Sequence, residues 1–90
     1  MRSIEITLKF KKDARLAKKR GLDIKKLDAV IRLLCNDEVL PERYRDHVLS
    51  GEYHGHSECH IEPDWLLIYR KSADGLVLTA VRTGSHSDLF

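Results

Sequence analysis

Three histidines, one aspartate and one arginine in the second half of the chain could together move protons and bind an anion. They are His47, His60, Asp64, Arg82 and His86. Histidine gives or takes a proton near neutral pH, because its ordinary pKa is about 6.5. The planar guanidinium of arginine matches the oxygens of a phosphate. This combination predicts acid–base chemistry on a phosphodiester, which is the chemistry of a ribonuclease.

The reaction that fits these residues is the attack of a ribose 2′-hydroxyl on its own 3′-phosphate. It needs a base for the hydroxyl proton, an acid for the leaving 5′-oxygen and a cation beside the phosphate. The histidines supply the base and the acid, Arg82 supplies the cation, and Asp64 can orient a histidine. The reaction requires no metal ion and no cofactor.

The pattern of the chain predicts which element carries each of these side chains. Residues 57–62 alternate as in a strand, which points His60 away from the core side chain of Cys59. Pro63 should end this strand, because it cannot donate a hydrogen bond within a sheet. Asp64 then lies close to His60 and begins the next strand.

A second hairpin should bring the remaining residues to the same place. The apolar run 65–69 predicts a central strand, and Ala-Asp-Gly at 73–75 predicts a turn back through the strand 76–81. Arg82 should therefore return beside Asp64. A short kink at 83–85 should swing His86 over the same end of the sheet.

The first half of the chain predicts one strand and two helices. Residues 2–7 alternate apolar and polar side chains, as in a half-buried strand. Thr7 can cap a helix that ends at Gly21, and Asp23 can cap a second helix that ends near Asn36. The short link between the helices predicts an antiparallel hairpin.

These elements predict a single α+β domain over residues 1–90, in the order β-α-α-β-β-β. The two-helix hairpin should pack on one face of a twisted antiparallel sheet. The irregular residues 37–46 should connect the helical half to the sheet half. Cys35 and Cys59 are expected to be buried free thiols, as in a reducing compartment.

The charge distribution points to a polyanion as partner. Residues 1–26 hold 10 Lys and Arg against 3 Asp and Glu, whereas the rest of the chain holds 6 against 11. A basic block on a small protein favours RNA, although a merely solvated helix face fits equally well. There is no apolar run of about 20 residues and no signal peptide, which predicts a cytoplasmic protein without membrane contact.

A zinc site is the competing interpretation of the segment His54-Gly55-His56-Ser57-Glu58-Cys59-His60. Its geometry is unfavourable, because Cys59 and His60 are neighbours on a strand and face opposite ways. The chain has no second Cys/His cluster to complete a tetrahedral site.

Several of these residues also resemble a known family. His-Ile-Glu-Pro-Asp-Trp-Leu-Leu-Ile-Tyr at 60–69 and Arg-Thr-Gly-Ser-His-Ser-Asp-Leu-Phe at 82–90 look like the YafQ-like mRNA interferase toxins of the RelE/ParE superfamily. The resemblance extends upstream through 44–51 and, more loosely, 12–20. It implies a RelE-like fold and a type II toxin that cuts mRNA in the ribosomal A site and is neutralised by a cognate antitoxin, in a heterotetramer.

The resemblance also implies roles for individual residues. The family's catalytic positions fall on His47, His60, Asp64 and His86, its phosphate-contacting arginine on Arg82, and its base-stacking terminal aromatic on Phe90. Lys11, Lys18 and Lys19 are the candidates for contact with rRNA. Ser57 departs from the family pattern, which has an arginine at this position. The departure concerns how strongly this strand binds RNA.

Two other functions remain open at this stage. The first is a non-catalytic inhibitor on the same fold, such as a ParE-like toxin that binds gyrase. The second is a small module that binds RNA or protein through its basic helix alone. A set of histidines around Asp64 and Arg82 favours catalysis, but it leaves open which histidine is the base and which the acid.

Overall fold

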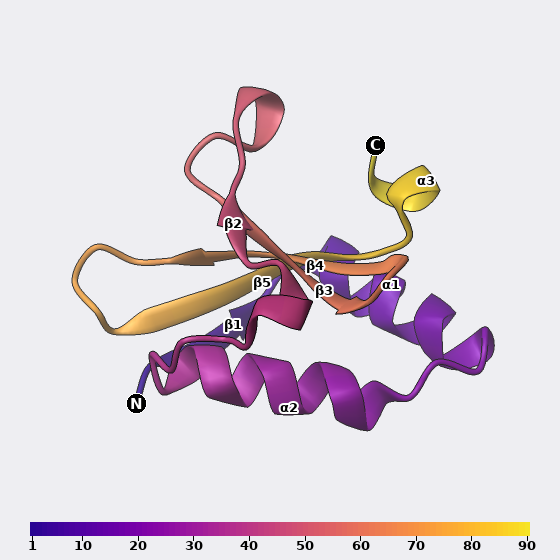
Figure 1. Ribbon diagram of the computed structural model, residues 1–90, viewed down its shortest axis with the longest axis horizontal. Coiled ribbons are helices and arrows are strands. Elements are labelled where there is room, and N and C mark those ends of the chain that lie inside the picture. The colour runs from indigo at the N-terminus through magenta and orange to yellow at the C-terminus, as the bar shows by residue number, and fades with distance from the viewer.

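A five-stranded sheet in the order β1-β5-β4-β3-β2 runs through the middle of the computed structural model, which describes residues 1–90 (Figure 1). The strands are β1 (Ser3–Ile6), β2 (His47–Val48), β3 (Ser57–Glu62), β4 (Trp65–Lys71) and β5 (Val77–Gly84). The helices are α1 (Leu8–Lys19), α2 (Ile24–Cys35) and the short α3 (His86–Leu89), with 3₁₀ turns η1 (Glu42–Tyr44) and η2 (Gly51–Tyr53). The predicted α+β fold is confirmed.

Local capping sets the bounds of the two long helices, as the sequence predicted. The Thr7 hydroxyl accepts a hydrogen bond from the Phe10 backbone N–H at 3.0 Å, which starts α1. The Asp23 carboxylate accepts one from the Lys25 N–H at 3.0 Å, which starts α2. Gly21 follows α1 with a positive φ of 83°, the conformation that ends many helices.

The sheet is mixed, whereas the sequence analysis predicted an antiparallel one. The pairs β2–β3, β3–β4 and β4–β5 are antiparallel, but β1 lies parallel to β5. A tight turn imposes antiparallel pairing only on strands that follow each other directly. Two helices and three strands separate β1 from β5, so no such constraint acts on this pair.

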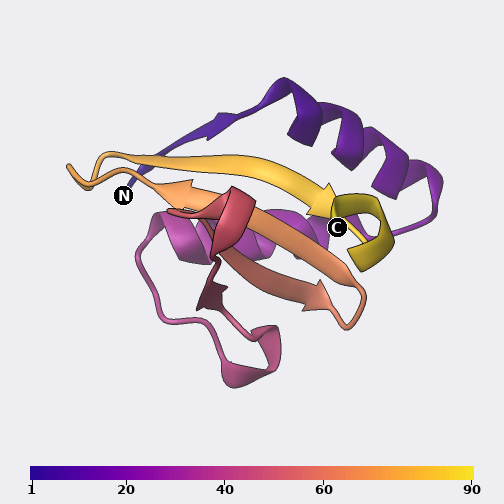
Figure 2. The same cartoon turned by 90° about the horizontal axis from the view of Figure 1, so that it is seen from above.

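The main core lies between the sheet and the two long helices. Leu27, Val30 and Leu34 of α2 pack there with Trp65 and Leu67 of the central strand β4. Figure 2 shows α2 running beneath the sheet, with α1 beside β1 and β5. The prediction that 65–69 forms a central buried strand is confirmed, because all five residues are buried.

A smaller cluster covers the opposite face of the sheet. Leu66 and Ile68 of β4 pack there against Leu89 of α3, with Leu49 and Tyr53 at the margin. In Figure 1 the segment that carries η2 and the helix α3 stand on this side of the sheet, away from α2. The face between these two segments carries the candidate site.

The predictions for individual elements have mixed outcomes. Cys35 and Cys59 are buried free thiols, as predicted, and burial raises the pKa of Cys59. The strand β1 is fully exposed, not half-buried, because it lies at the edge of the sheet with Ile4 48% and Ile6 51% exposed. No helix is both long enough and apolar enough to cross a membrane.

Candidate active site

A buried carboxylate joins two of the predicted histidines. Glu58 is 4% exposed, and its Oε1 lies 3.5 Å from Nε2 of His47 and 3.6 Å from Nε2 of His60. His47 pairs with Glu58 across β2 and β3, and His60 follows two residues later on the same face of β3. The sheet register thus brings both imidazoles to one acidic group.

Backbone carbonyls fix the other ring nitrogen of each of these histidines. Nδ1 of His47 lies 2.7 Å from the Arg45 carbonyl oxygen, and Nδ1 of His60 lies 3.2 Å from the Pro63 carbonyl oxygen. A carbonyl only accepts hydrogen bonds, so both Nδ1 atoms are assigned as donors. The nitrogen that gains or loses the second proton is therefore Nε2, which faces Glu58.

Asp64 holds the third predicted histidine. Its Oδ1 accepts a hydrogen bond from the backbone N–H of His86 at 3.0 Å and lies 3.5 Å from the Nδ1 of the same residue. The ring centroids of His60 and His86 are 6.0 Å apart. The predicted convergence of His60, Asp64 and His86 is confirmed, and Asp64 contacts His86.

The helix α3 has only four residues, and capping bonds keep it in place. Ser85 and Asp88 form a reciprocal capping box, in which each side chain accepts the backbone N–H of the other. Arg20 of α1 donates to Asp88 at 2.6 Å, and this bond lowers the pKa of Asp88. A Cβ on Gly84 would lie 3.0 Å from the Asp88 side chain, so this close approach favours glycine.

The guanidinium of Arg82 binds a carboxylate of the first helix. Its Nε and one terminal nitrogen donate to Asp13 of α1 at 2.7 and 3.1 Å, so its carboxylate partner is not Asp64. Bonds to Asp13 are the main reason that the pKa of Arg82 is raised, and Tyr53 contributes. A bulge between Ile68 and Tyr69 shifts the register of β4 against β5, so that Arg82 lies opposite Ile68.

Arg82 nevertheless remains near Asp64. Together with Asp64 it lines a cleft of about 350 Å³ between α1 and the end of β5. A guanidinium carries five N–H donors, and the two bonds to Asp13 leave the others free for an anion. The expected location of Arg82 beside Asp64 is thus confirmed, and its ion-pair partner is Asp13.

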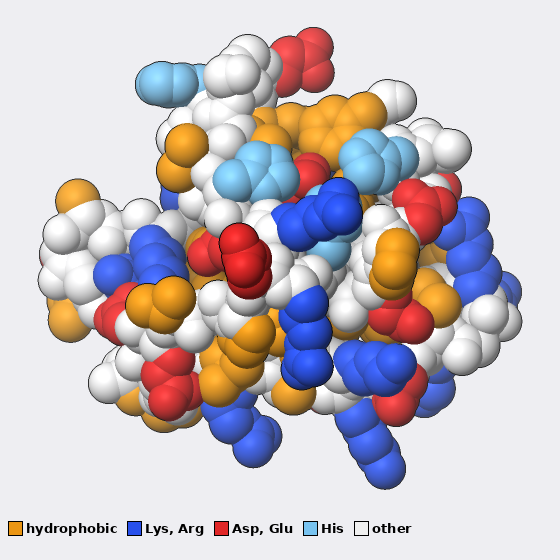
Figure 3. Space-filling model, viewed as in Figure 1, with side chains coloured by type: hydrophobic (Ala, Val, Ile, Leu, Met, Phe, Trp, Pro, Cys, Tyr) orange, Lys and Arg blue, Asp and Glu red, His pale blue; other side chains and the backbone are white.

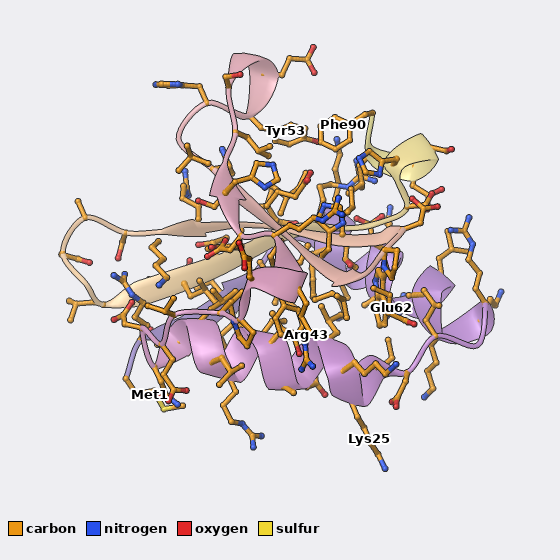
Figure 4. The ribbon with its side chains drawn as sticks, in the orientation of Figure 1. Met1, Lys25, Arg43, Tyr53, Glu62 and Phe90 are labelled. Atoms are coloured by element: carbon orange, nitrogen blue, oxygen red, sulfur yellow. The ribbon has the colours of Figure 1, made fainter.

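Aromatic side chains border the site on the side of η2. Phe90 is 62% exposed, and its ring centroid lies 6.0 Å from that of His86 and 5.8 Å from that of Tyr53. Figure 4 shows Tyr53 and Phe90 facing each other above the sheet. An exposed ring in this position has a free face on which a base can stack.

Histidine side chains gather around a cationic side chain near the centre of the face that Figure 3 shows.

The three lysines that are candidates for contact with rRNA, Lys11, Lys18 and Lys19, are exposed on α1. No group of three or more His, Cys, Asp or Glu side chains is arranged to hold a metal ion. Cys59 belongs to the main core, away from His60, as the strand alternation predicted.

Sequence reasoning missed three residues that shape the site. Glu58 carried a usable signal, because alternation places it on the same face as His60 two residues later. Tyr53 and Asp13 carried none, since each meets the site through contacts between distant segments.

Comparisons with known proteins match the chain over its whole length. Residues 2–90 match the family described as "Bacterial toxin of type II toxin-antitoxin system, YafQ". The chain is 46% identical over 90 residues to the mRNA interferase toxin YafQ of Escherichia coli K12, a match that covers 99% of this chain and 96% of the relative.

Two solved structures extend the similarity to the whole fold. The toxin in the E. coli DinJ–YafQ toxin–antitoxin complex superposes with a TM-score of 0.88 at 42% identity, over 99% of this chain and 97% of that one. The metal-bound toxin from Helicobacter pylori superposes with a TM-score of 0.93 at 41% identity, over 100% of both chains.

Proposed function

The chain belongs to the YafQ toxin family of type II toxin–antitoxin systems, and on this premise we propose that it is a ribosome-dependent endoribonuclease. It would cleave mRNA in the ribosomal A site and so inhibit translation. The observation that carries the proposal is the convergence of His47 and His60 on Glu58, with the ring of His86 6.0 Å from that of His60. The His47 and His86 side chains are 49% and 59% exposed and that of His60 is 11% exposed, so two of the three rings are open to a substrate.

In the proposed reaction the 2′-hydroxyl of the A-site nucleotide attacks the adjacent phosphorus. One histidine removes the hydroxyl proton, and another protonates the 5′-oxygen that leaves. The products are a 2′,3′-cyclic phosphate, or the 3′-phosphate after its hydrolysis, and a 5′-hydroxyl. We assign His86 to one of the two roles and His60 or His47 to the other.

The remaining site residues would support these transfers. Asp64 orients His86 through its contacts with the backbone N–H and Nδ1. Arg82, anchored by Asp13, presents its free donors to the phosphate oxygens as negative charge develops there. Phe90 would stack on a base beside the scissile bond. The mechanism uses no metal ion and no cofactor.

Two partners other than mRNA belong to the proposal. Lys11, Lys18 and Lys19 are exposed on one helix and would bind rRNA phosphates, which places the toxin on the ribosome in the cytoplasm. A cognate antitoxin would neutralise it in a heterotetramer. The structures of the E. coli relative with its antitoxin DinJ support the binding of an antitoxin.

The decisive test uses purified ribosomes that carry an mRNA with a defined A-site codon. We expect one cut in that codon, with a 5′-hydroxyl on the downstream fragment, both with and without EDTA. A 2′-deoxy nucleotide at the scissile position should prevent the cut, because it removes the attacking hydroxyl. Inhibition of gyrase without any cut would instead identify a non-catalytic toxin, and loss of cleavage in EDTA would contradict metal independence.

A further inference from the structure

A second and larger cleft opens on the other side of His60. Its volume is about 650 Å³, and it lies between α2, η1 and the end of β3. The strand β2 pairs only with residues 57 and 58 of β3, so it leaves the outer edge of β3 uncovered from Cys59 onward. The residues that line the cleft are Lys26, Ala29, Arg43, Tyr44, Arg45, His60, Ile61, Glu62 and Pro63.

The charge of this larger cleft is positive and largely uncompensated. Three of its residues are cations and one is a carboxylate, which gives a formal charge of +2 with His60 neutral. Lys26 and Glu62 lie 3.7 Å apart and offset each other. Arg43 and Arg45 are exposed and take part in no ion pair of the structure. Arg43 and Glu62 both lie above α2 in Figure 4.

The smaller cleft, which Arg82 lines, has the opposite formal charge. Two arginines and three aspartates line it, which gives a formal charge of −1. Arg20 is paired with Asp88, and Arg82 is paired with Asp13. Of the two clefts, only the one that Arg43 lines therefore offers a nucleic acid strand arginines that are not paired with a carboxylate.

The backbone of η1 couples this larger cleft to the site. Arg45 follows η1 with φ of 47° and ψ of 46°, a left-handed conformation that costs about 1 kcal/mol in a residue other than glycine. In this conformation its carbonyl oxygen accepts from Nδ1 of His47 while its side chain lines the cleft. Arg45 thus contributes both to the histidine site, through its carbonyl oxygen, and to the larger cleft.

The side chain of Arg43 is held ready for an anion. Its guanidinium carbon lies 4.8 Å above the centre of the Tyr44 ring, and one terminal nitrogen donates to the Tyr44 hydroxyl at 2.9 Å. A ring orients the guanidinium without neutralising its charge. The Arg43 side chain therefore loses less conformational entropy when a phosphate binds.

We propose that this cleft binds the single-stranded RNA next to the scissile phosphate, with Arg43 and Arg45 on successive backbone phosphates. The proposal rests on the proposed ribonuclease function and adds the path of the substrate strand. It also separates two roles: the Arg43–Arg45 cleft holds the RNA, and the Arg82 cleft takes part in the reaction at the scissile bond.

The test compares two double variants that each remove two positive charges. The first is Arg43→Gln, Arg45→Gln, and the control is Arg32→Gln, Arg70→Gln. Both control positions are exposed, form no ion pair and lie outside both clefts. The probe is a fluorescent 2′-O-methyl RNA heptamer, which lacks the attacking hydroxyl and is not consumed. Its dissociation constant is measured between 50 and about 200 mM salt.

The double variant should bind the heptamer about tenfold more weakly at low salt, and the slope of log K against log salt should fall by about 1.4. This slope corresponds to two lost phosphate contacts on a single strand, at about 0.7 each. The control should keep the slope of the unmodified protein. An unchanged slope in the double variant, or an equal loss in the control, would overturn the proposal.

Cleavage of mRNA on programmed ribosomes separates this proposal from the function it rests on. If the unmodified protein cuts mRNA but the double variant binds RNA like the control, the cleft assignment is wrong and the ribonuclease stands. If the unmodified protein does not cut while heptamer binding still depends on Arg43 and Arg45, the ribonuclease is wrong and the RNA path stands. Matching thermal midpoints of both variants would show that neither change acts through folding.

Discussion

The carboxylate of Asp64 binds His86 at two points, the backbone N–H at 3.0 Å and the ring Nδ1 at 3.5 Å. Asp64 begins the turn into β4, and His86 begins α3, so one side chain ties the two segments together. The position of His86 is therefore fixed by contacts made outside the main core. A change of its ring should affect chemistry more than folding.

The first prediction follows for His86→Ala. We expect mRNA cleavage on programmed ribosomes to fall by about 10²–10⁴-fold, the usual loss when a general acid or base is removed. Folding and ribosome binding should persist, because the side chain is exposed. The measurements are the cleavage rate and the thermal midpoint, and His54→Ala is the matched control at an exposed histidine. Normal cleavage by His86→Ala would contradict the catalytic assignment.

The second prediction concerns Glu58→Gln, which keeps the shape of the side chain and removes its charge. The amide no longer places a negative charge 3.5 Å from Nε2 of His47 and 3.6 Å from Nε2 of His60, so both rings lose the group that positions them. We expect the rate of mRNA cleavage to fall about tenfold or more. A cleavage rate equal to that of the control Glu52→Gln would mean that Glu58 serves only the fold.

The third prediction concerns the basic helix α1. Replacing Lys11, Lys18 and Lys19 by Gln should weaken ribosome association and lower its salt dependence, since each lost phosphate contact reduces the slope. Cleavage at saturating toxin should remain. Pelleting with ribosomes at several salt concentrations measures the effect, beside the charge-matched triple variant of Lys25, Arg32 and Arg70. If the α1 variant stopped cleavage at saturation while His86→Ala cut normally, a basic binding module would be the better account.

The fourth prediction uses the lowered pKa of Asp88. The charged carboxylate is favoured in the folded state by Arg20, so its stabilisation is present above the unfolded pKa of about 3.9 and is lost as the pH falls below that value. At pH 7 Asp88→Asn should lower the thermal midpoint by a few degrees, since both partners are partly exposed. The difference between the two proteins should begin to shrink below about pH 4 and should close only when the pH falls below the lowered pKa of Asp88. A difference that does not shrink at all below about pH 4 would exclude this ion pair as its source.

The fifth prediction concerns the antitoxin. Ile4 and Ile6 are 48% and 51% exposed on the edge strand β1, and Leu8, which begins α1 just after it, is 70% exposed. An antitoxin segment that folds on binding should cover apolar surface of this kind. Co-expression with the protein encoded beside it should give a heterotetramer by light scattering, and Ile4→Ser, Ile6→Ser should weaken it. A toxin that stays monodisperse and ignores that protein would argue against the pairing.

Elements set by local chemistry could be predicted from the sequence. Thr7 and Asp23 cap their helices through bonds to residues two or three positions away, so the local sequence is sufficient. The run 65–69 is apolar throughout, because β4 is covered on both faces. His60, Asp64 and His86 came together as predicted because they lie at the ends of consecutive strands.

Features that depend on contacts between distant segments could not be predicted. The partner of Arg82 depends on the bulge beside Ile68 and on the position of α1. The residues around Arg82 in the sequence give no signal for either feature. The parallel pairing of β1 depends equally on the final sheet order. Glu58 is an intermediate case: strand alternation places it on the face of His60, but its burial follows only from the pairing of β3 with His47.

The parallel pairing of β1 with β5 also bears on when the toxin becomes active during synthesis. The Thr7 hydroxyl donates to the carbonyl of Val81, 74 residues away, and Asp13 holds Arg82 from a distance of 69 residues. Such high contact order makes folding slow, since a large loop must close before these contacts form. The nascent chain cannot complete its sheet until β5 has left the exit tunnel. If the protein acts on ribosomes as proposed, the ribosome that makes it is spared until Arg82 can be anchored to Asp13.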